Sequence, residues 1–221
     1  MVINIEQQNK IFRDISNKIS MPIIVYAIGG TAMMFKGLKP STLDIDIVFT
    51  KEEDRQEFKK AVKSLGYEDF DATIVYGKRE NAPDMVKVPD SRIDLFLNQV
   101  VNFSFTESIK ERAKDVHQFG DNLIIKIADM HDIIVMKCAT TRPKDEADIV
   151  KIVKNETINW NLLVKEADEQ IQLGNELAVL SLGTLLEKLL NKYKIAVPPS
   201  VLDDLWKLLN KQVEKKGKKD L

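Results

Sequence analysis

A short run of alternating residues places the strongest constraint on the fold. It reads Leu43-Asp44-Ile45-Asp46-Ile47-Val48-Phe49, apolar against acid at first. Successive side chains of a strand point to opposite faces, so Asp44 and Asp46 share one face while Ile45 and Ile47 share the other. The pattern therefore predicts a strand that buries one apolar face in a sheet and keeps an acidic face on the other side.

A glycine pair lies shortly before this strand. The β-rich run Ile23–Ile28 ends in Gly29-Gly30, and Thr31–Phe35 has the character of a short helix. Glycines between a strand and a helix let backbone N–H groups approach an anion, and the start of a helix attracts negative charge. The alternative is a tight turn that needs a positive φ angle and binds nothing.

Predicted strands are concentrated early in the chain and predicted helices late. The early part is expected to contain further strands and two helices, the second opened by a capping box of Thr50 and Glu53 and ending at Gly66. The first helix is expected over Ile5–Ile19, and the further strands over Ala72–Tyr76, Met85–Val88 and Ile93–Leu97.

The later part is predicted to be helical. Helices are expected over Ile133–Ala139 and Ile149–Val153, then throughout from Asn159, with a last helix that begins at Pro198-Pro199. This distribution predicts an α+β fold, in which a mixed β-sheet flanked by helices is followed by a C-terminal helical region. The expected domains are residues 1–155 and 156–221.

Composition excludes several classes of protein. The 33 basic and 34 acidic residues give a formal net charge of −1, unlike a generally basic nucleic-acid coat or an acidic tail. One cysteine, Cys138, excludes an intramolecular disulfide framework and a Cys-rich zinc site. The apolar segment Met21–Phe35 contains two glycines and is short for a membrane helix, which needs about 17 apolar residues. We expect a cytoplasmic protein that does not bind membranes.

The acids of the alternating strand suit a metal site. Two carboxylates on one face of a rigid strand can share a hard divalent cation such as Mg²⁺, which prefers oxygen ligands. A third acid, Asp94, lies in the apolar run Ile93-Asp94-Leu95-Phe96, where burial is costly unless the acid is paired or metal-bound. The alternatives are an edge strand that shows Asp44 and Asp46 to solvent, and a strand-end acid at position 94.

Together these motifs resemble the nucleotidyltransferase superfamily related to DNA polymerase β. The resemblance rests on Gly29-Gly30-Thr31, Asp44-Ile45-Asp46 and Ile93-Asp94-Leu95, and covers roughly residues 20–150. Similar members include the minimal nucleotidyltransferases and the AbiEii-type toxins of toxin–antitoxin systems. The resemblance implies that residues 1–155 form the nucleotidyltransferase-like domain.

A later segment resembles the toxin-like branch. Its residues Lys137, Arg142, Asp145 and Asp148 are similar to the family segment Lys-x-x-Ala-x-x-Arg-x-x-Asp-x-x-Asp, although Pro143 and Lys144 change the spacing. The resemblance implies that these four residues bind nucleotide, with Lys137 on the phosphates. The alternative is the solvated, charged start of a helix.

The resemblance implies an enzyme that transfers a nucleoside monophosphate from an NTP to a hydroxyl acceptor and releases pyrophosphate. Asp44, Asp46 and Asp94 would be catalytic and would bind Mg²⁺ or Mn²⁺, while Gly29, Gly30 and Thr31 would contact the nucleotide. The resemblance leaves the acceptor open between tRNA, a protein and a small molecule such as an aminoglycoside, and it allows an antitoxin protein as a partner. The alternatives are a non-catalytic module of the same fold that binds nucleotide or a protein partner, and a purely structural domain.

Overall fold

The chain divides into two compact units. The computed structural model describes residues 2–79, 81–138 and 142–217. The sheet unit comprises Met1–Val101 and Phe105–Asp129, and the helical unit comprises Asn102–Ser104 and Met130–Leu221. The domain boundary expected after residue 155 stays a prediction. None of the described helices is both long enough and apolar enough to cross a membrane.

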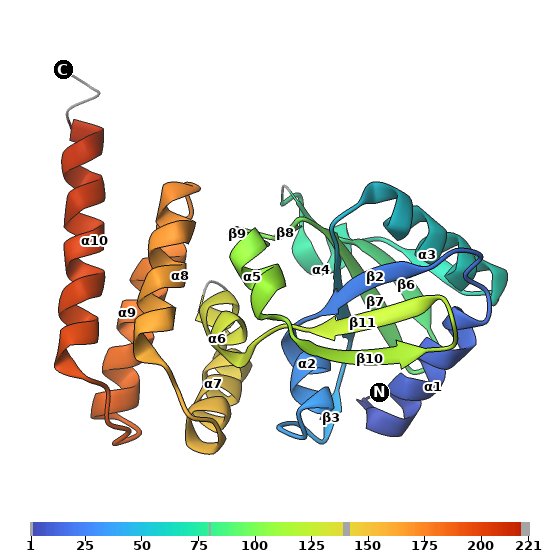
Figure 1. Cartoon of the computed structure of the whole chain (residues 1–221), viewed down its shortest axis with the longest axis horizontal. Coiled ribbons are helices and arrows are strands. Elements are labelled where there is room, and N and C mark those ends of the chain that lie inside the picture. The colour runs from blue at the N-terminus through green and yellow to red at the C-terminus, as the bar shows by residue number, and fades with distance from the viewer. Residues whose placement is uncertain (1, 80, 139–141, 218–221) are drawn as a thin grey trace. The chain divides into compact units, whose positions relative to one another are not determined.

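The sheet unit is built around seven strands in the order β10-β11-β2-β4-β7-β6-β5 (Figure 1). The pairs β11/β2 and β4/β7 are parallel and the others antiparallel, so the sheet is mixed as predicted. The elements of this unit are β1 (Ile3–Asn4), α1 (Ile5–Ser16), β2 (Ile23–Ala27), α2 (Gly29–Phe35), β3 (Ser41–Thr42), β4 (Ile45–Phe49), α3 (Glu52–Ser64), β5 (Glu68–Phe70), α4 (Thr73–Tyr76), β6 (Asp84–Val88), β7 (Ser91–Leu97), β8 (Gln99–Val100), α5 (Glu107–Arg112), β10 (Asp115–Phe119) and β11 (Leu123–Ile127).

Apolar side chains of α1, α3 and the sheet form the core of this unit. The two helices contact each other, and α3 packs on β4 and β7. Phe49 of β4 meets Phe58 of α3 edge to face, with ring centroids 5.4 Å apart, and both side chains are fully buried. Ile45 and Ile47 are also fully buried. The alternation therefore anchors β4 through its apolar face, as predicted.

The helical unit is a bundle. Its helices α6, α8 and α9 contact one another, and α10 packs on α8 and α9. The last helix begins at Pro199, as the proline pair predicts. The elements are β9 (Phe103–Ser104), α6 (Met130–Cys138), α7 (Pro143–Asn155), α8 (Trp160–Gln172), α9 (Glu176–Asn191) and α10 (Pro199–Gly217). Ala139, the last residue of the helix expected over 133–139, lies outside the described residues.

Two local predictions are wrong. Residues 73–76 form the one-turn helix α4 instead of a strand, because the Asp71 carboxylate accepts hydrogen bonds from the Thr73 backbone N–H and hydroxyl and closes a turn. The capping box of Thr50 and Glu53 does not form. The chain stays extended through Lys51, which is the N-cap of α3 and makes no side-chain cap.

Strands β10 and β11 are absent from the sequence-based expectation, which placed strands only early in the chain. They form a hairpin that completes the sheet, because β11 pairs with β2 in parallel. The signal was the run Leu123–Ile127, whose first, third and fifth residues are buried, after a turn at Gly120.

Candidate active site

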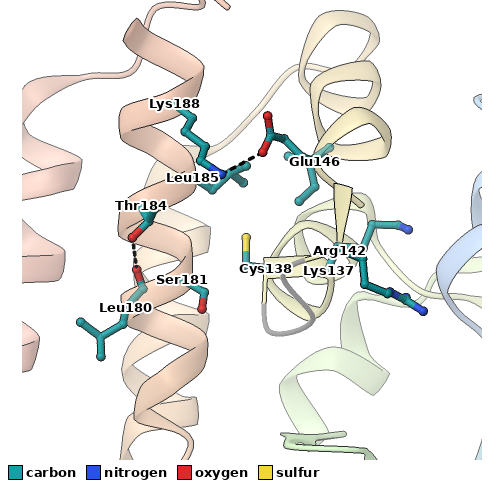
Figure 2. A pocket seen from close by; sticks show the side chains of 10 residues that line it. Lys137, Cys138, Arg142, Glu146, Leu180, Ser181, Thr184, Leu185 and Lys188 are labelled. Carbon is teal, nitrogen blue, oxygen red and sulfur yellow. Dashed lines mark hydrogen bonds and ion pairs between the residues drawn. The ribbon is translucent and has the colours of Figure 1, made fainter. Parts of the chain in front are cut away.

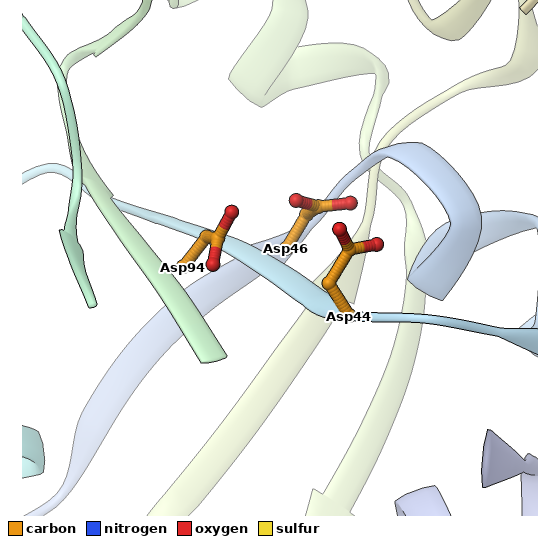
Figure 3. Close-up of side chains that lie close together, drawn as sticks. All are labelled: Asp44, Asp46 and Asp94. Carbon is orange, nitrogen blue, oxygen red and sulfur yellow. The ribbon is translucent and has the colours of Figure 1, made fainter. Parts of the chain in front are cut away.

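Strands β4 and β7 bring three acids together. Asp46 and Asp94 are direct partners in the parallel register of β4 and β7, and Asp44 immediately precedes β4. One carboxylate oxygen from each acid lies within 4.8 Å of those of the other two (Figure 3). The register, which the sequence alone does not specify, therefore adds the third acid to the pair predicted by alternation.

The three carboxylates differ in burial. Asp94 is fully buried, the side chain of Asp44 is 12% exposed, and Asp46 is half-buried. Burial raises the pKa of Asp94, and this outweighs the hydrogen bond from Tyr76 and the charge of Arg92, which both favour the ionised form. A carboxyl with a raised pKa accepts a proton more readily than an exposed aspartate does.

Arg92 and Tyr76 are the site residues that sequence reasoning missed. Arg92 donates from Nη2 to Asp44 Oδ2 (2.6 Å) and from Nε to Asp94 Oδ1 (3.0 Å). The Tyr76 hydroxyl donates to Asp94 Oδ2 at 2.7 Å. Arg92 had a signal, because it precedes Asp94 by two residues in β7 and so points to the same face. Tyr76 had none, because its position depends on the turn at Asp71.

The lack of a side chain at Gly29 leaves space for the Asp46 carboxylate. The residue has a φ of +54°, and a Cβ built on it would lie 2.6 Å from Asp46 Oδ2. The helix α2 begins here, two residues earlier than the sequence predicts. The positive φ and the close approach explain why glycine is needed at this position.

Gly30 and Thr31 contact neighbouring strands. A Cβ on Gly30 would lie 2.4 Å from Thr42 Oγ1. Thr31 is fully buried, and its hydroxyl oxygen accepts a hydrogen bond from the Asp46 backbone N–H at 2.9 Å. The close approach at Gly30 places α2 against β3, and the Thr31 hydrogen bond positions β4 against α2. The predicted contacts of Gly29, Gly30 and Thr31 with nucleotide phosphates stay predictions.

The other four predicted residues form a charged cluster within the helical unit. Lys137, whose side chain is 8% exposed, donates to Asp145 Oδ1 (2.9 Å) and Asp148 Oδ2 (2.7 Å), and Arg142 donates to Asp145 Oδ2 (2.6 Å). Burial alone would lower the pKa of Lys137, but the two carboxylates raise it above its ordinary value. The predicted role of this cluster in nucleotide binding stays a prediction.

A cavity of about 200 Å³ lies beside this cluster (Figure 2). Glu146, which lines the cavity, forms an ion pair with Lys188, with Nζ and Oε2 2.9 Å apart. Burial raises the pKa of the Cys138 thiol, so the cysteine is a packing residue rather than a nucleophile. The residues that line the cavity are Lys137, Cys138, Arg142, Glu146, Ile149, Leu180, Ser181, Thr184, Leu185 and Lys188.

The acid triad fits a hard divalent cation. Its ligand atoms are all carboxylate oxygens, which suit Mg²⁺ or Mn²⁺ and lack the nitrogen and sulfur that zinc favours. Two of the acids come from the same chain segment and the third from the neighbouring strand, so their relative positions are set by the sheet. Such an arrangement can hold a divalent cation on oxygens from two neighbouring chain segments.

Two solved structures are similar to this chain. ANT(2″)-Ia, in complex with adenylyl-2″-tobramycin, is 13% identical over 82% of this chain and 98% of that chain, with a TM-score of 0.44. The solution structure of the antibiotic-resistance factor ANT(2″)-Ia is 13% identical over 83% and 93%, with a TM-score of 0.42. Both scores are too low to carry an argument about this chain.

No curated protein matches the sequence significantly. The profile of the family described as nucleotidyltransferase of unknown function, DUF6036, matches residues 3–193 and so spans both units. The chain therefore belongs to the DUF6036 family within the nucleotidyltransferase superfamily.

Proposed function

We propose that this protein is a metal-dependent enzyme that transfers a nucleoside monophosphate from an NTP to a hydroxyl group and releases pyrophosphate. The observation that carries the proposal is the convergence of Asp44, Asp46 and Asp94 within 4.8 Å on adjacent strands. Membership of a nucleotidyltransferase family supports it. An exposed acidic surface would not need a fully buried third member such as Asp94.

In this mechanism the acids divide the work. Asp44 and Asp46 would hold Mg²⁺ or Mn²⁺, which when bound neutralises the triphosphate and polarises its α-phosphate. Asp94 would take part in the same site and accept the proton of the attacking hydroxyl, a role that its position opposite Asp46 on the neighbouring strand supports. The hydroxyl oxygen forms a bond to the α-phosphorus, the bond to the β-phosphate oxygen breaks, and pyrophosphate leaves.

The remaining residues of the proposal act on the nucleotide. Backbone N–H groups at Gly29 and Gly30 and the hydroxyl of Thr31 would contact phosphate. Within the helical unit, Lys137, Arg142, Asp145 and Asp148 are proposed to bind nucleotide, as the family resemblance implies. Catalysis of this kind depends mostly on positioning and charge stabilisation. The acceptor would be a hydroxyl of tRNA, a protein or a small molecule, and a toxin-like role would pair the enzyme with an antitoxin.

The test is pyrophosphate release from each of the four NTPs with Mg²⁺, in the presence of tRNA, cellular protein or polyhydroxylated small molecules. Asp94→Asn should bind NTP within a few-fold of wild type yet lose about 10²- to 10⁴-fold in turnover, because it removes an interaction made mainly in the transition state. Asp90→Asn, an exposed acid four residues earlier, is the matched control and should remain active.

Two outcomes would contradict the proposal. Mg²⁺-dependent NTP binding without pyrophosphate release on any acceptor would favour the non-catalytic binding module. Absence of NTP binding in the presence of Mg²⁺ would show that the protein does not act on nucleotides.

A further inference from the structure

One guanidinium joins two of the three acids. Arg92 lies in β7, and its two donor nitrogens reach Asp44 before β4 and Asp94 within β7, at 2.6 and 3.0 Å. The side chain is 25% exposed, so these ion pairs are largely removed from water. Because the guanidinium is planar with donors in a fixed fork, it fixes the direction of its bonds to both carboxylates.

A tyrosine occupies the other oxygen of the buried acid. The Tyr76 hydroxyl donates to Asp94 Oδ2 at 2.7 Å, while Arg92 holds Oδ1. The Tyr76 ring packs edge-on against Phe96, with centroids 6.1 Å apart. Both oxygens of Asp94 are thus engaged, so a cation that binds Asp94 must share or replace one of these partners.

The two partners of Asp94 are not equally replaceable. The arginine bond joins opposite charges and belongs to a two-point contact, whereas the tyrosine bond comes from a neutral donor. Tyr76 also ends the one-turn helix α4, whose residues Ile74 and Val75 are 71% and 43% exposed. A short, exposed turn moves at lower cost than a residue in the middle of a sheet.

We propose that Arg92 is a positioning residue, which holds Asp44 and Asp94 in metal-binding geometry, and that Tyr76 is a displaceable occupant that the cation replaces on Asp94. This inference rests on the proposed function, because it takes the triad as the metal site. Cation binding then loosens α4 next to the site, while Arg92 keeps the two acids in place.

The test measures Mn²⁺ binding to the full-length protein without nucleotide, by electron paramagnetic resonance of free Mn²⁺. Tyr76→Phe keeps the ring and removes the competing hydroxyl, so it should lower the Mn²⁺ dissociation constant roughly three- to tenfold, the range of one net hydrogen bond. Tyr193→Phe is the matched control, because the Tyr193 hydroxyl also donates to a carboxylate, that of Glu146, at 2.7 Å. It should leave the dissociation constant unchanged.

Arg92→Lys separates positioning from charge. The lysine keeps the positive charge but loses the fork, so positioning predicts Mn²⁺ binding roughly tenfold weaker than in wild type. Equal or tighter binding would overturn the role given to Arg92. Circular dichroism and the urea midpoint show whether each variant is folded before Mn²⁺ is added.

Hydrogen exchange of the wild-type protein tests the same proposal without a substitution. Mn²⁺ should speed exchange of the amides of Tyr76 and Gly77, which donate hydrogen bonds to the carbonyl oxygens of Ala72 and Thr73. Unchanged or slower exchange, or a Tyr76→Phe dissociation constant equal to that of wild type, would overturn the displacement. If wild type binds no Mn²⁺ at all, the proposed function fails as well. If it binds Mn²⁺ but the variants match it, only this inference fails.

Discussion

Each unit of the molecule contains a cluster of buried carboxylates and basic side chains, and the two clusters are arranged differently. In the helical unit, Lys137 lies between Asp145 and Asp148 and bonds to both. In the sheet unit, the carboxylate oxygens of three acids converge within 4.8 Å of one another. Arg92 pairs with two of these three acids, so both clusters contain ion pairs, but three converging carboxylates also offer oxygen ligands to a divalent cation.

This difference predicts opposite consequences of removing charge. A buried salt bridge is costly to break from one side, because the remaining charges keep the penalty of burial. Neutralising carboxylates of the triad relieves their mutual repulsion but also breaks ion pairs with Arg92, so the two effects on stability oppose each other while metal binding is lost. The free energy of unfolding should therefore depend mainly on the charges of the helical unit, and metal binding on those of the sheet unit.

The largest expected effect is the loss of stability that Lys137→Met causes. The substitution leaves Asp145 and Asp148 without the lysine on which both converge and should destabilise the helical unit by about 3–5 kcal/mol. Both tryptophans, Trp160 and Trp206, lie in this unit, so urea unfolding followed by tryptophan fluorescence reports on it. Lys151→Met, at an exposed position of α7, is the control. An unchanged midpoint for Lys137→Met would mean that the cluster is not structural.

The second effect concerns the triad. At a ligand concentration of about 100 times the dissociation constant, Mn²⁺ with NTP should stabilise the wild-type protein by about 2.7 kcal/mol. Asp44→Asn combined with Asp46→Asn should abolish this gain while the protein still folds without ligand. The measurement is the thermal shift with and without ligand. A full shift in the double variant would contradict the metal assignment.

Alanine substitutions at two glycines distinguish backbone strain from steric damage to the metal site. Gly29 and Gly37 both have positive φ, so alanine at either should cost about 1–2 kcal/mol of stability. A Cβ at Gly29 would lie 2.6 Å from Asp46, whereas a Cβ at Gly37 has no neighbour within 4 Å. Only Gly29→Ala should therefore weaken Mn²⁺ binding. Equal affinities in the two variants would show that Gly29 matters for the turn alone.

The smallest effect is a pH dependence in the helical unit. Hydrogen bonds from Lys192, Tyr193 and Lys188 lower the pKa of Glu146 from 4.5 to about 2. A depressed carboxyl pKa gives stability that is present above pH 4.5 and is lost as the pH falls towards 2. Because Glu146 and its partners lie near the surface, we expect Glu146 to contribute about 1 kcal/mol or less to the free energy of unfolding.

Urea midpoints between pH 5 and pH 2.5 check this dependence. Glu146→Gln should flatten the pH dependence of stability in this window, and Glu156→Gln, an exposed acid at the end of α7, should not. A wild-type slope that survives Glu146→Gln would assign the acid sensitivity to other carboxyls, such as those of the Lys137 cluster.

Much of the fold follows from local patterns. Alternation predicts β4 and the shared face of Asp44 and Asp46, and the proline pair predicts the start of α10. These features depend on side-chain periodicity and on restricted φ, which act within a few residues. The α+β class, with a mixed sheet and helices after it, follows from the same local patterns and is confirmed.

The features that sequence reasoning missed are set by contacts between distant residues. Arg92 reaches Asp44 across 48 positions of the chain, and Tyr76 reaches Asp94 across 18. Strand β11 is stabilised by parallel pairing with β2, about a hundred residues earlier. In α4, the hydrogen bond that the Asp71 side chain accepts from the Thr73 backbone N–H stabilises a turn, although Ile74 and Val75 favour a strand.

The central claim is that the triad binds the metal of a nucleotidyl-transfer site, and a crystal structure with Mn²⁺ and a non-hydrolysable NTP tests it most directly. The account predicts anomalous manganese density within about 2.0–2.4 Å of oxygens from Asp44, Asp46 and Asp94, with the triphosphate on the same ion. Manganese elsewhere in the molecule, or a bound triphosphate with Asp94 outside coordinating distance of the metal, would contradict it.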